Sequence, residues 1–204
     1  MTEKISRVLV VLANSISESD IRANVVNSLC KSFAEACQTK GIEVDLIDLY
    51  KDEDFDPVHY LNEKDTKVLE YQIRLKKAQL IVFFHPVWWL SVPAILKGFL
   101  DKVLVNGFAF QNRGKTVKDL LGDKRAIVFA VSEKPSWQID YIYGNVLKNF
   151  WSKGVLEYCG MKNTVHTFGN FRAVSEEEIK KWQTKVEKIA LNLDNKNANN
   201  LDFF

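Results

Sequence analysis

The stretch LIVFFHPVWWLSVPAILKGFLDKV, residues 80–103, decides the fold of this chain. Its first part, Leu80–His85, is short, apolar and rich in β-branched and aromatic residues, which predicts a buried strand. Ser91 and Pro93 mark the start of a helix that runs to Val103, because proline is favoured in the first turn of a helix. A buried strand followed closely by such a helix indicates an α/β protein.

The segments on both sides repeat this alternation. Strands are predicted at Arg7–Ala13, Glu43–Leu49, Ala126–Val131 and Thr164–Phe168, and helices at Ile21–Lys40, Glu63–Lys77, Asp140–Lys153 and Ser175–Leu193. Gly41 ends the first of these helices, and Ser175 with Glu178 forms a capping box at the last. We therefore expect a doubly wound, five-stranded parallel sheet in the flavodoxin-like order 2-1-3-4-5, with helices on both faces. One domain is expected over residues 1–193, followed by a polar tail over residues 194–204.

Composition narrows the class of protein. The chain has 204 residues, 47% of them hydrophobic and 26% charged, which is typical of a globular domain and not of a disordered or fibrous chain. The formal net charge is +2, and the basic residues are mixed with acidic ones, so no nucleic-acid partner is expected. No stretch approaches the roughly 20 apolar residues that span a bilayer, so no membrane insertion is expected either.

The cysteines and the N-terminus indicate the compartment. Cys30, Cys37 and Cys159 are odd in number and lack metal-type spacing, which favours free thiols in a reducing environment. The apolar run near the N-terminus is short and has no signal-peptide layout. We expect a cytoplasmic protein.

The predicted topology places the ligand site. In a sheet of this order the ligand lies beyond the carboxyl ends of the strands, at the switch point between strands 1 and 3. The residues that follow Ala13, Phe84 and Val131 should therefore line the site.

The loop after strand 1 is rich in hydroxyl and amide side chains. The candidates for binding a cofactor's phosphate here are Asn14, Ser15, Ser17, Ser19, Arg22 and Asn24. Hydroxyls beside the free N–H groups of a helix N-terminus suit a phosphate. The alternative is an ordinary serine- or aspartate-capped helix without a ligand. The loop has no glycine, so it is neither a P-loop nor a dinucleotide-binding fingerprint.

The loop after strand 3 carries adjacent tryptophans. Its candidate ligand contacts are Pro86, Val87, Trp88, Trp89 and Leu90. Two indoles at the mouth of a sheet suit a planar ring system whose polar edge meets backbone N–H groups. Alternatively, both indoles pack over the sheet or in a subunit contact.

The loop after strand 4 is polar and is followed by tyrosines. Ser132, Glu133 and Lys134 are candidates for binding the edge of such a ring, and Tyr141 and Tyr143 are candidate catalytic groups. The alternative is an ordinary connection between a strand and a helix. No metal site is expected, because the three histidines are isolated from one another and from paired cysteines.

At these residues the chain resembles the flavodoxin-like NAD(P)H:quinone oxidoreductases, of the DT-diaphorase, KefF and modulator-of-drug-activity types. The matching pieces are VLVVLANS at 8–15, DLY at 48–50 with FDPV at 55–58, the segment 86–110, and, more weakly, YCGM at 158–161. The resemblance covers about 165 residues, nearly the whole chain.

The resemblance implies a cofactor and an assembly. It implies FMN, or else FAD, held without a covalent bond by residues 86–90 and by the Ser17–Asn24 loop. It implies NAD(P)H as co-substrate, a quinone-like acceptor in a ping-pong reaction, and a homodimer with each active site at the subunit boundary. Two other readings are a flavin- or nucleotide-binding regulatory subunit of a partner such as an ion-efflux system, and an electron carrier, which the near-neutral charge disfavours.

The chain departs from the family's pattern in three places. Asn14 stands where the family usually has histidine. Ser132-Glu133-Lys134-Pro135 replaces Thr-Thr-Gly-Gly, and proline has no N–H to offer a ring. No histidine occurs between Pro86 and Val165, so the histidine of the family's Tyr/His pair is missing, and Tyr141 or Tyr143 is left for the tyrosine role.

Overall fold

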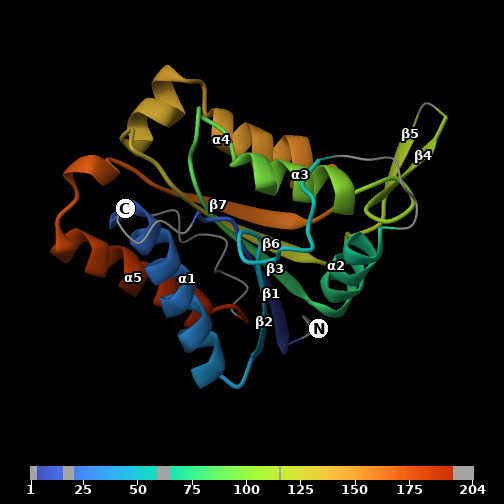
Figure 1. The fold of residues 1–204 in the computed structure, drawn as a ribbon, viewed down its shortest axis with the longest axis horizontal. Helices are drawn as coiled ribbons and strands as arrows, with labels where there is room; N and C mark the ends of the chain where they lie inside the picture. Colours follow the sequence, from blue (N-terminus) through green and yellow to red (C-terminus); the bar gives the residue numbers. More distant parts are fainter. Residues whose placement is uncertain (1–3, 16–20, 59–64, 115, 195–204) are drawn as a thin grey trace.

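The computed structural model describes residues 4–15, 21–58, 65–114 and 116–194, and it alternates strands and helices as predicted (Figure 1). The strands are β1 (Arg7–Leu12), β2 (Glu43–Asp48), β3 (Leu80–Pro86), β4 (Phe110–Arg113), β5 (Thr116–Asp119), β6 (Arg125–Val131) and β7 (Lys162–Phe168). The helices are α1 (Ile21–Thr39), α2 (Thr66–Lys77), α3 (Ala94–Val103), α4 (Val146–Lys148) and α5 (Glu176–Leu191), with π-helical segments η1 (Gln138–Ile142) and η2 (Asn149–Leu156) and a 3-10 turn, η3 (Phe171–Ala173).

Five of the strands form one parallel sheet. β1 pairs with β2 and β3, β3 pairs with β6, and β6 pairs with β7. The order β2-β1-β3-β6-β7 confirms the predicted flavodoxin-like order 2-1-3-4-5, counted over the strands of this sheet. The direction in which strands are added reverses between β1 and β3, so this pair is the switch point at which such sheets bind ligands.

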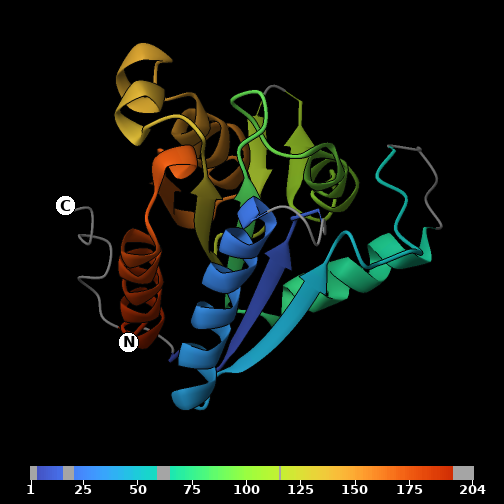
Figure 2. The ribbon, with the colours of Figure 1, turned by 60° about the vertical axis from the view of Figure 1, so that its left-hand side comes forward.

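Helices cover both faces of the sheet, as predicted (Figures 1 and 2). On one face α1 and α5 lie side by side, and their apolar residues, among them Phe33 and Val186, form one buried cluster with Val8 and Val10 of β1. Leu9 and Val11 of β1 point to the other face, because successive side chains of a strand alternate. Continuous burial of the central strands follows from this two-sided cover.

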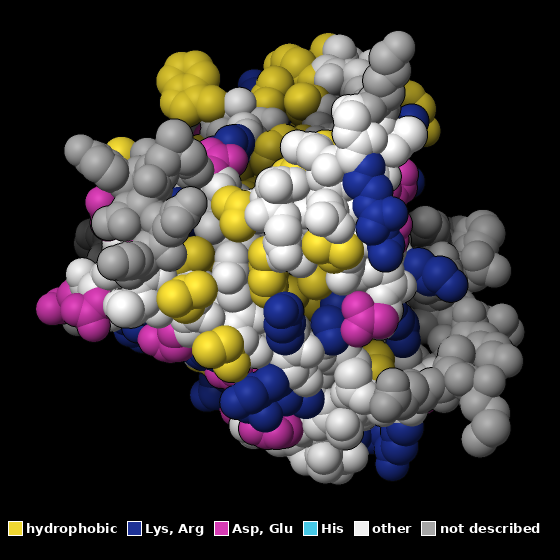
Figure 3. Space-filling model, turned by 90° about the vertical axis from the view of Figure 1, so that its right-hand side faces the viewer, with side chains coloured by type: hydrophobic (Ala, Val, Ile, Leu, Met, Phe, Trp, Pro, Cys, Tyr) yellow, Lys and Arg dark blue, Asp and Glu magenta, His cyan; other side chains and the backbone are white. Residues whose placement is uncertain are grey.

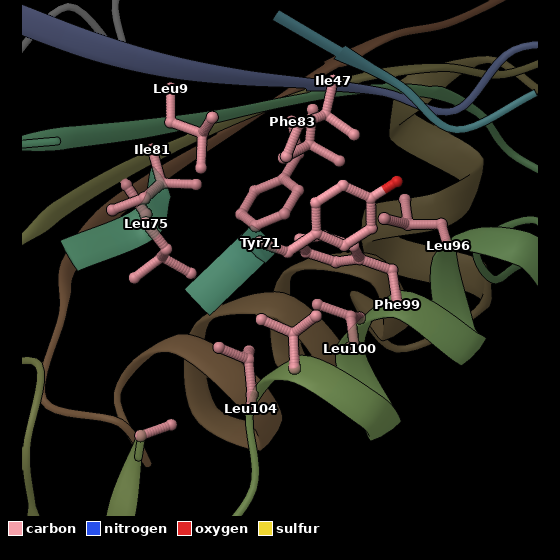
Figure 4. Close-up of a cluster of buried hydrophobic side chains, with 14 of the residues drawn as sticks. Leu9, Ile47, Tyr71, Leu75, Ile81, Phe83, Leu96, Phe99, Leu100 and Leu104 are labelled. Carbon is pink, nitrogen blue, oxygen red and sulfur yellow. The ribbon is translucent and has the colours of Figure 1, made fainter. Parts of the chain in front are cut away.

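The second face is covered by α2, α3 and η2, and its core is drawn in Figure 4. Side chains from α2 and α3 converge there on the strands: Tyr71, Leu75, Leu96, Phe99 and Leu100 meet Leu9, Ile47, Ile81 and Phe83. Each cluster contains more than twenty buried apolar side chains, so hydrophobic burial is the main source of stability on both faces.

Two helix starts have the caps that fix their boundaries. The Asp65 carboxylate accepts the backbone N–H groups of Lys67 and Val68 at the start of α2. The Ser175 hydroxyl accepts the N–H of Glu178, which is one of the two hydrogen bonds of the capping box predicted for α5. The Glu178 carboxylate accepts the indole N–H of Trp182, one turn further along the helix.

Two segments differ from the prediction. Asp140–Lys153 is not one continuous helix: η1 ends before Tyr143, and α4 begins only at Val146. Gly144 and Asn145 between them have φ values of +65° and +55°, a left-handed conformation that a right-handed helix cannot continue through. The second difference is an unpredicted antiparallel hairpin of β4 and β5, which projects from the body beyond α3 (Figure 1).

The face that carries α2 and the hairpin is seen in Figure 3. Lysine and arginine side chains are interspersed there with acidic ones, and hydrophobic side chains gather near the centre and along the upper edge. This face therefore has the mixed charge that the sequence predicts. In the part of the chain described by the structure, no helix is long and apolar enough to cross a membrane.

Candidate functional site

The loops after β1, β3 and β6 meet around one pocket of about 320 Å³. The predicted cofactor residues that line it are Asn14, Ser15, Pro86, Val87, Trp88, Trp89 and Glu133. The pocket lies at the carboxyl ends of β1 and β3, where the topology places a ligand. Its volume falls at the lower end of the roughly 300–1,000 Å³ typical of small-molecule sites.

The β3–α3 loop makes a tight turn that presents the two indoles. Trp88 and Ser91 exchange two backbone hydrogen bonds of 2.9 and 3.0 Å, which close the turn. Trp89 and Leu90 at its tip have φ values of +50° and +58°. Residues other than glycine pay about 1–3 kcal/mol each for this left-handed conformation, and such strain gathers at binding sites.

The turn directs the side chains of Trp88 and Trp89 into the pocket lining and that of Leu90 into the protein. Trp89 is fully exposed and Trp88 is 42% exposed, and both line the pocket. Leu90 instead packs against the small buried cluster of Ala130, Ile139 and Leu147, outside the pocket lining. Of the two sequence-based alternatives for the indoles, packing over the sheet is therefore wrong for Trp89.

Pro86, the last residue of β3, is held by the side chain of His85, which is completely buried. His85 Nδ1 lies 2.8 Å from the carbonyl oxygen of Pro86, and His85 Nε2 lies 3.1 Å from the indole nitrogen of Trp151. Burial lowers the pKa of His85 from its usual value to about 4, so the imidazole is neutral at physiological pH.

The loop after β6 is bound to the end of β7. Ser132 donates its N–H to Phe168 and accepts the N–H of Phe171 with its carbonyl, while Asn170 donates to the carbonyl of Lys134. The Ser132 hydroxyl accepts the N–H of Lys134 at 3.0 Å, so this side chain shapes the loop. Glu133 lines the pocket, whereas Lys134 is exposed and outside the lining.

The predicted phosphate residues divide into three groups. Asn14 is buried in the pocket wall and donates to the side chain of Asn27 over 3.1 Å, and Ser15 lines the pocket beside it. Asn24 is exposed on the first turn of α1 and is not part of the lining. Ser17, Ser19 and the side chain of Arg22 lie outside the described residues.

The candidate catalytic tyrosines stand outside the pocket lining. Tyr141 belongs to η1 and Tyr143 directly follows it, and both side chains are exposed. Trp137 and Ile142 of the same segment are also exposed, so an apolar rim follows the β6 loop. An exposed group of large apolar side chains usually marks a binding surface.

Three pocket residues were not expected from the sequence: Val26, Val131 and Phe171. Val131 is the last residue of β6, directly before the candidate residues Ser132, Glu133 and Lys134. Phe171 follows β7, the fifth strand of the sheet. Ligands lie beyond the carboxyl ends of the strands, so the same rule applied to β7 would have found this residue. Val26 lies in α1, and no pattern in the sequence distinguishes it from the other apolar positions of that helix.

The donors and walls of the pocket fit a planar, partly polar ring system. Pro86, Val87 and the two indoles form an apolar wall, and Asn14, Ser15 and Glu133 bring polar groups to its edge. Among the described residues no group of three or more histidine, cysteine or acidic side chains comes together as a metal site. All three cysteines are free and buried, which raises their thiol pKa values to about 12 for Cys30 and Cys37 and about 11 for Cys159.

The doubly wound sheet and the pocket at its switch point define a flavodoxin-like α/β protein. The chain belongs to the flavodoxin-like fold family, whose model matches residues 6–191. Ribosyldihydronicotinamide dehydrogenase (quinone) of Rattus norvegicus is 34% identical over 131 residues, which cover 60% of this chain and 57% of that protein. FMN-dependent NADH:quinone oxidoreductase 2 of Clostridium perfringens is 32% identical over 134 residues, 60% of this chain and 66% of that protein.

A solved structure is similar over nearly the whole chain. Smu.1420 from Streptococcus mutans UA159 has a TM-score of 0.75 and 25% identity, and the match covers 91% of this chain and 99% of that one. The two sequence relatives, by contrast, are each matched over less than two thirds of their own length.

Proposed function

We propose that this protein is a flavin-dependent oxidoreductase that passes hydride from NAD(P)H, through the bound flavin, to a quinone or a similar electrophile. The observation that carries the proposal is the pocket where three loops meet at the switch point, walled by Trp88 and Trp89. The names of the two matched relatives, a quinone-linked dehydrogenase and an FMN-dependent NADH:quinone oxidoreductase, support the same activity.

The cofactor we propose is FMN. Residues 86–90 would hold the isoalloxazine, with Trp88 and Trp89 beside it, and the loop after β1 would take the phosphate from the side of Asn14 and Ser15. The flavin supplies the hydride chemistry, for which protein side chains have no equivalent. FMN is favoured over FAD because the pocket is small and one matched relative is named as FMN-dependent.

The protein's own residues position the reactants. The exposed indole of Trp89 and the half-exposed indole of Trp88 offer flat apolar surface for an aromatic ligand and exclude water from its edge. Tyr141 or Tyr143 would donate a hydrogen bond to the acceptor oxygen as it gains charge. We expect nicotinamide and acceptor to use the same open side of the pocket in turn, which gives ping-pong kinetics.

We also propose that two copies of the chain pair across this region. Trp137, Tyr141 and Ile142 are 53%, 84% and 61% exposed and adjoin the pocket loop, so a second copy would cover them and complete the acceptor side. Light scattering of the purified protein should give a dimer mass, and a monomer at micromolar concentration would contradict this arrangement.

A spectroscopic titration tests the proposed activity. The purified protein, loaded with FMN and freed of excess, should show the visible flavin bands. Anaerobic NADPH or NADH should bleach them, and a quinone should restore them. A protein that retains neither FMN nor FAD contradicts the flavin proposal.

The second candidate is a flavin-binding regulatory subunit with little activity of its own. It is favoured by Glu133 and Pro135, which place a charge and a rigid ring in the loop where the resembled family has Thr-Thr-Gly-Gly. The same titration separates the candidates, because a regulatory subunit would keep its flavin oxidised when NAD(P)H is added.

Replacing Trp88 and Trp89 together with alanine is expected to weaken FMN binding by about 10–100-fold. Aromatic contacts contribute about 0.5–1.5 kcal/mol each beyond the area they bury, and a factor of ten corresponds to about 1.4 kcal/mol. Quenching of flavin fluorescence measures the affinity. Tyr158→Ala, which removes an exposed aromatic ring outside both the pocket lining and the proposed interface, is the control and should bind FMN as the unmodified protein does. Unchanged affinity in the double variant would show that the ring lies elsewhere.

A further inference from the structure

A buried pair of side chains lies at the end of β3, directly before the β3–α3 loop. His85 at the end of β3 and Trp151 of η2 are both completely buried, and their ring centroids are 5.5 Å apart. Trp151 also stacks obliquely on Phe83, with centroids 4.7 Å apart, so its indole is held on two sides. The pair therefore joins η2 to the strand from which the pocket loop departs.

The hydrogen bonds of the pair allow only one arrangement of protons. The indole N–H of Trp151 can only donate, so His85 Nε2, at 3.1 Å, must be the acceptor. The carbonyl of Pro86 can only accept, so His85 Nδ1, at 2.8 Å, must carry the proton. His85 is thus a neutral imidazole in its Nδ1–H form, and each nitrogen is used once.

The peptide between Pro86 and Val87 is held at both of its polar atoms. His85 Nδ1–H donates to its carbonyl oxygen, and its N–H donates to the carbonyl of Val131 over 2.7 Å. These two bonds fix the plane of the peptide from opposite ends. The strained turn of Trp89 and Leu90 begins only two residues later, and Pro86 and Val87 both line the pocket.

We propose that Trp151 and His85 are positioning residues for the pocket loop: Trp151 holds the His85 ring at Nε2 and favours its Nδ1–H form, and that proton fixes the Pro86–Val87 peptide against which the ligand ring lies. The proposal rests on the proposed flavin site. Neither side chain lines the pocket, so the pair acts through the backbone and touches no ligand.

Trp151→Phe is the central test, because it removes the indole N–H and keeps an aromatic ring against Phe83. His85 then has no hydrogen bond at Nε2, so its ring is held only by the bond to Pro86 and turns away from that carbonyl for part of the time. We expect FMN affinity to fall about tenfold, which corresponds to one hydrogen bond of about 1.4 kcal/mol. His85→Phe should have a similar effect, whereas His85→Asn, whose amide N–H can reach the same carbonyl, should restore most of the affinity.

Trp182→Phe is the matched control. Its indole N–H also makes one side-chain hydrogen bond, of 3.2 Å to Glu178, but it lies in the cluster on the opposite face of the sheet. FMN affinity should be unchanged in this variant. Equal losses in the Trp151 and Trp182 variants would overturn the proposal, since they would indicate general loosening of the core.

Nitrogen-15 NMR of the FMN-free protein tests the proposal without the cofactor. We expect the Nδ1–H form of His85 in the unmodified protein, shifted ring-nitrogen signals of His85 in Trp151→Phe, and shifted amide signals of Val87 and Trp88 in that variant but not in Trp182→Phe. An Nε2–H imidazole, or unmoved amide signals in Trp151→Phe, would overturn the proposal. Failure of the unmodified protein to bind flavin would instead contradict the proposed function.

Discussion

Gly98→Ala is expected to lower the free energy of unfolding by about 3 kcal/mol or more, because there is no space for a side chain at this position. Gly98 is buried in the middle of α3, where the backbone of Pro57 passes directly over it. A Cβ atom would overlap the Pro57 carbonyl oxygen and would lie 2.7 Å from its carbonyl carbon. Backbone atoms cannot rotate away as a side chain can, so the segment after β2 must move.

Displacing the backbone at Pro57 would also break the hydrogen bond that attaches the neighbouring Asp56 to α3. The ammonium group of Lys102, one turn further along α3, donates to the carbonyl of Asp56 at 2.9 Å and pairs with Asp65 at 2.6 Å. A Lys102 ammonium that loses the Asp56 carbonyl remains buried with Asp65 as its ion-pair partner, and a buried charge with one hydrogen bond fewer is less stable. Displacing Pro57 therefore destabilises the protein in two ways, through the steric clash and through the lost hydrogen bond of Lys102.

Urea denaturation followed by circular dichroism measures this loss. Gly154→Ala is the control, because a Cβ at Gly154 would have only the carbonyl oxygen of Asn149, at 3.6 Å, within contact distance. Its stability should stay within about 1 kcal/mol of the unmodified protein. A Gly98→Ala variant as stable as this control would mean that the α3 contact with Pro57 is much looser than the structure shows.

Gly169→Ala is expected to damage the pocket itself. Gly169 directly follows β7, and a Cβ there would overlap the backbone nitrogen of Ser136 and lie 2.8 Å from the carbonyl oxygen of Lys134. The β6 loop would be pushed from the end of β7, which breaks the bonds that Asn170 and Phe171 donate to it. Since Glu133 and Phe171 both line the pocket, we expect FMN affinity to fall by at least tenfold, together with about 2–3 kcal/mol of stability.

Ser136→Ala is the matched control, because it changes the side chain of Ser136 and leaves in place the backbone nitrogen that Gly169 approaches. It should keep both the stability and the FMN affinity of the unmodified protein. Thermal unfolding and flavin fluorescence measure the two quantities for both variants. Normal FMN binding by a destabilised Gly169→Ala protein would show that the β6 loop takes no part in holding the flavin, which would leave the ring to residues 86–90 alone.

The sheet and the place of the site could be predicted because each depends on local pattern. A strand covered on both faces is apolar throughout, so the apolar runs ending at Leu12, Phe84 and Val131 can be recognised as buried strands. The carboxyl ends of parallel strands share one edge, so the residues after these runs had to meet. The sequence singled out the adjacent tryptophans after strand 3 but left open whether they pack over the sheet, and the structure leaves Trp89 fully exposed.

The broken helix and the hairpin were missed because local pattern is ambiguous there. Ile139, Leu147 and Trp151 are buried, at a spacing that also fits a continuous helix, and only the left-handed residues Gly144 and Asn145 interrupt it. The hairpin of β4 and β5 is largely exposed and short, so it lacks the alternation of apolar and polar residues that identifies a strand.

The sequence by itself determined the order of elements, the parallel sheet and the edge at which ligands bind. Apolar runs alternate with amphipathic helices along the chain, and the carboxyl ends of parallel strands lie at one edge of the sheet. Only the tertiary structure decided which groups meet across that edge. It brought Phe171 to the pocket from beyond β7, pressed Gly169 against Ser136, and joined His85 to Trp151, 66 residues away in the chain. Such contacts leave no periodic signal, because they depend on how separate segments pack once the sheet has formed.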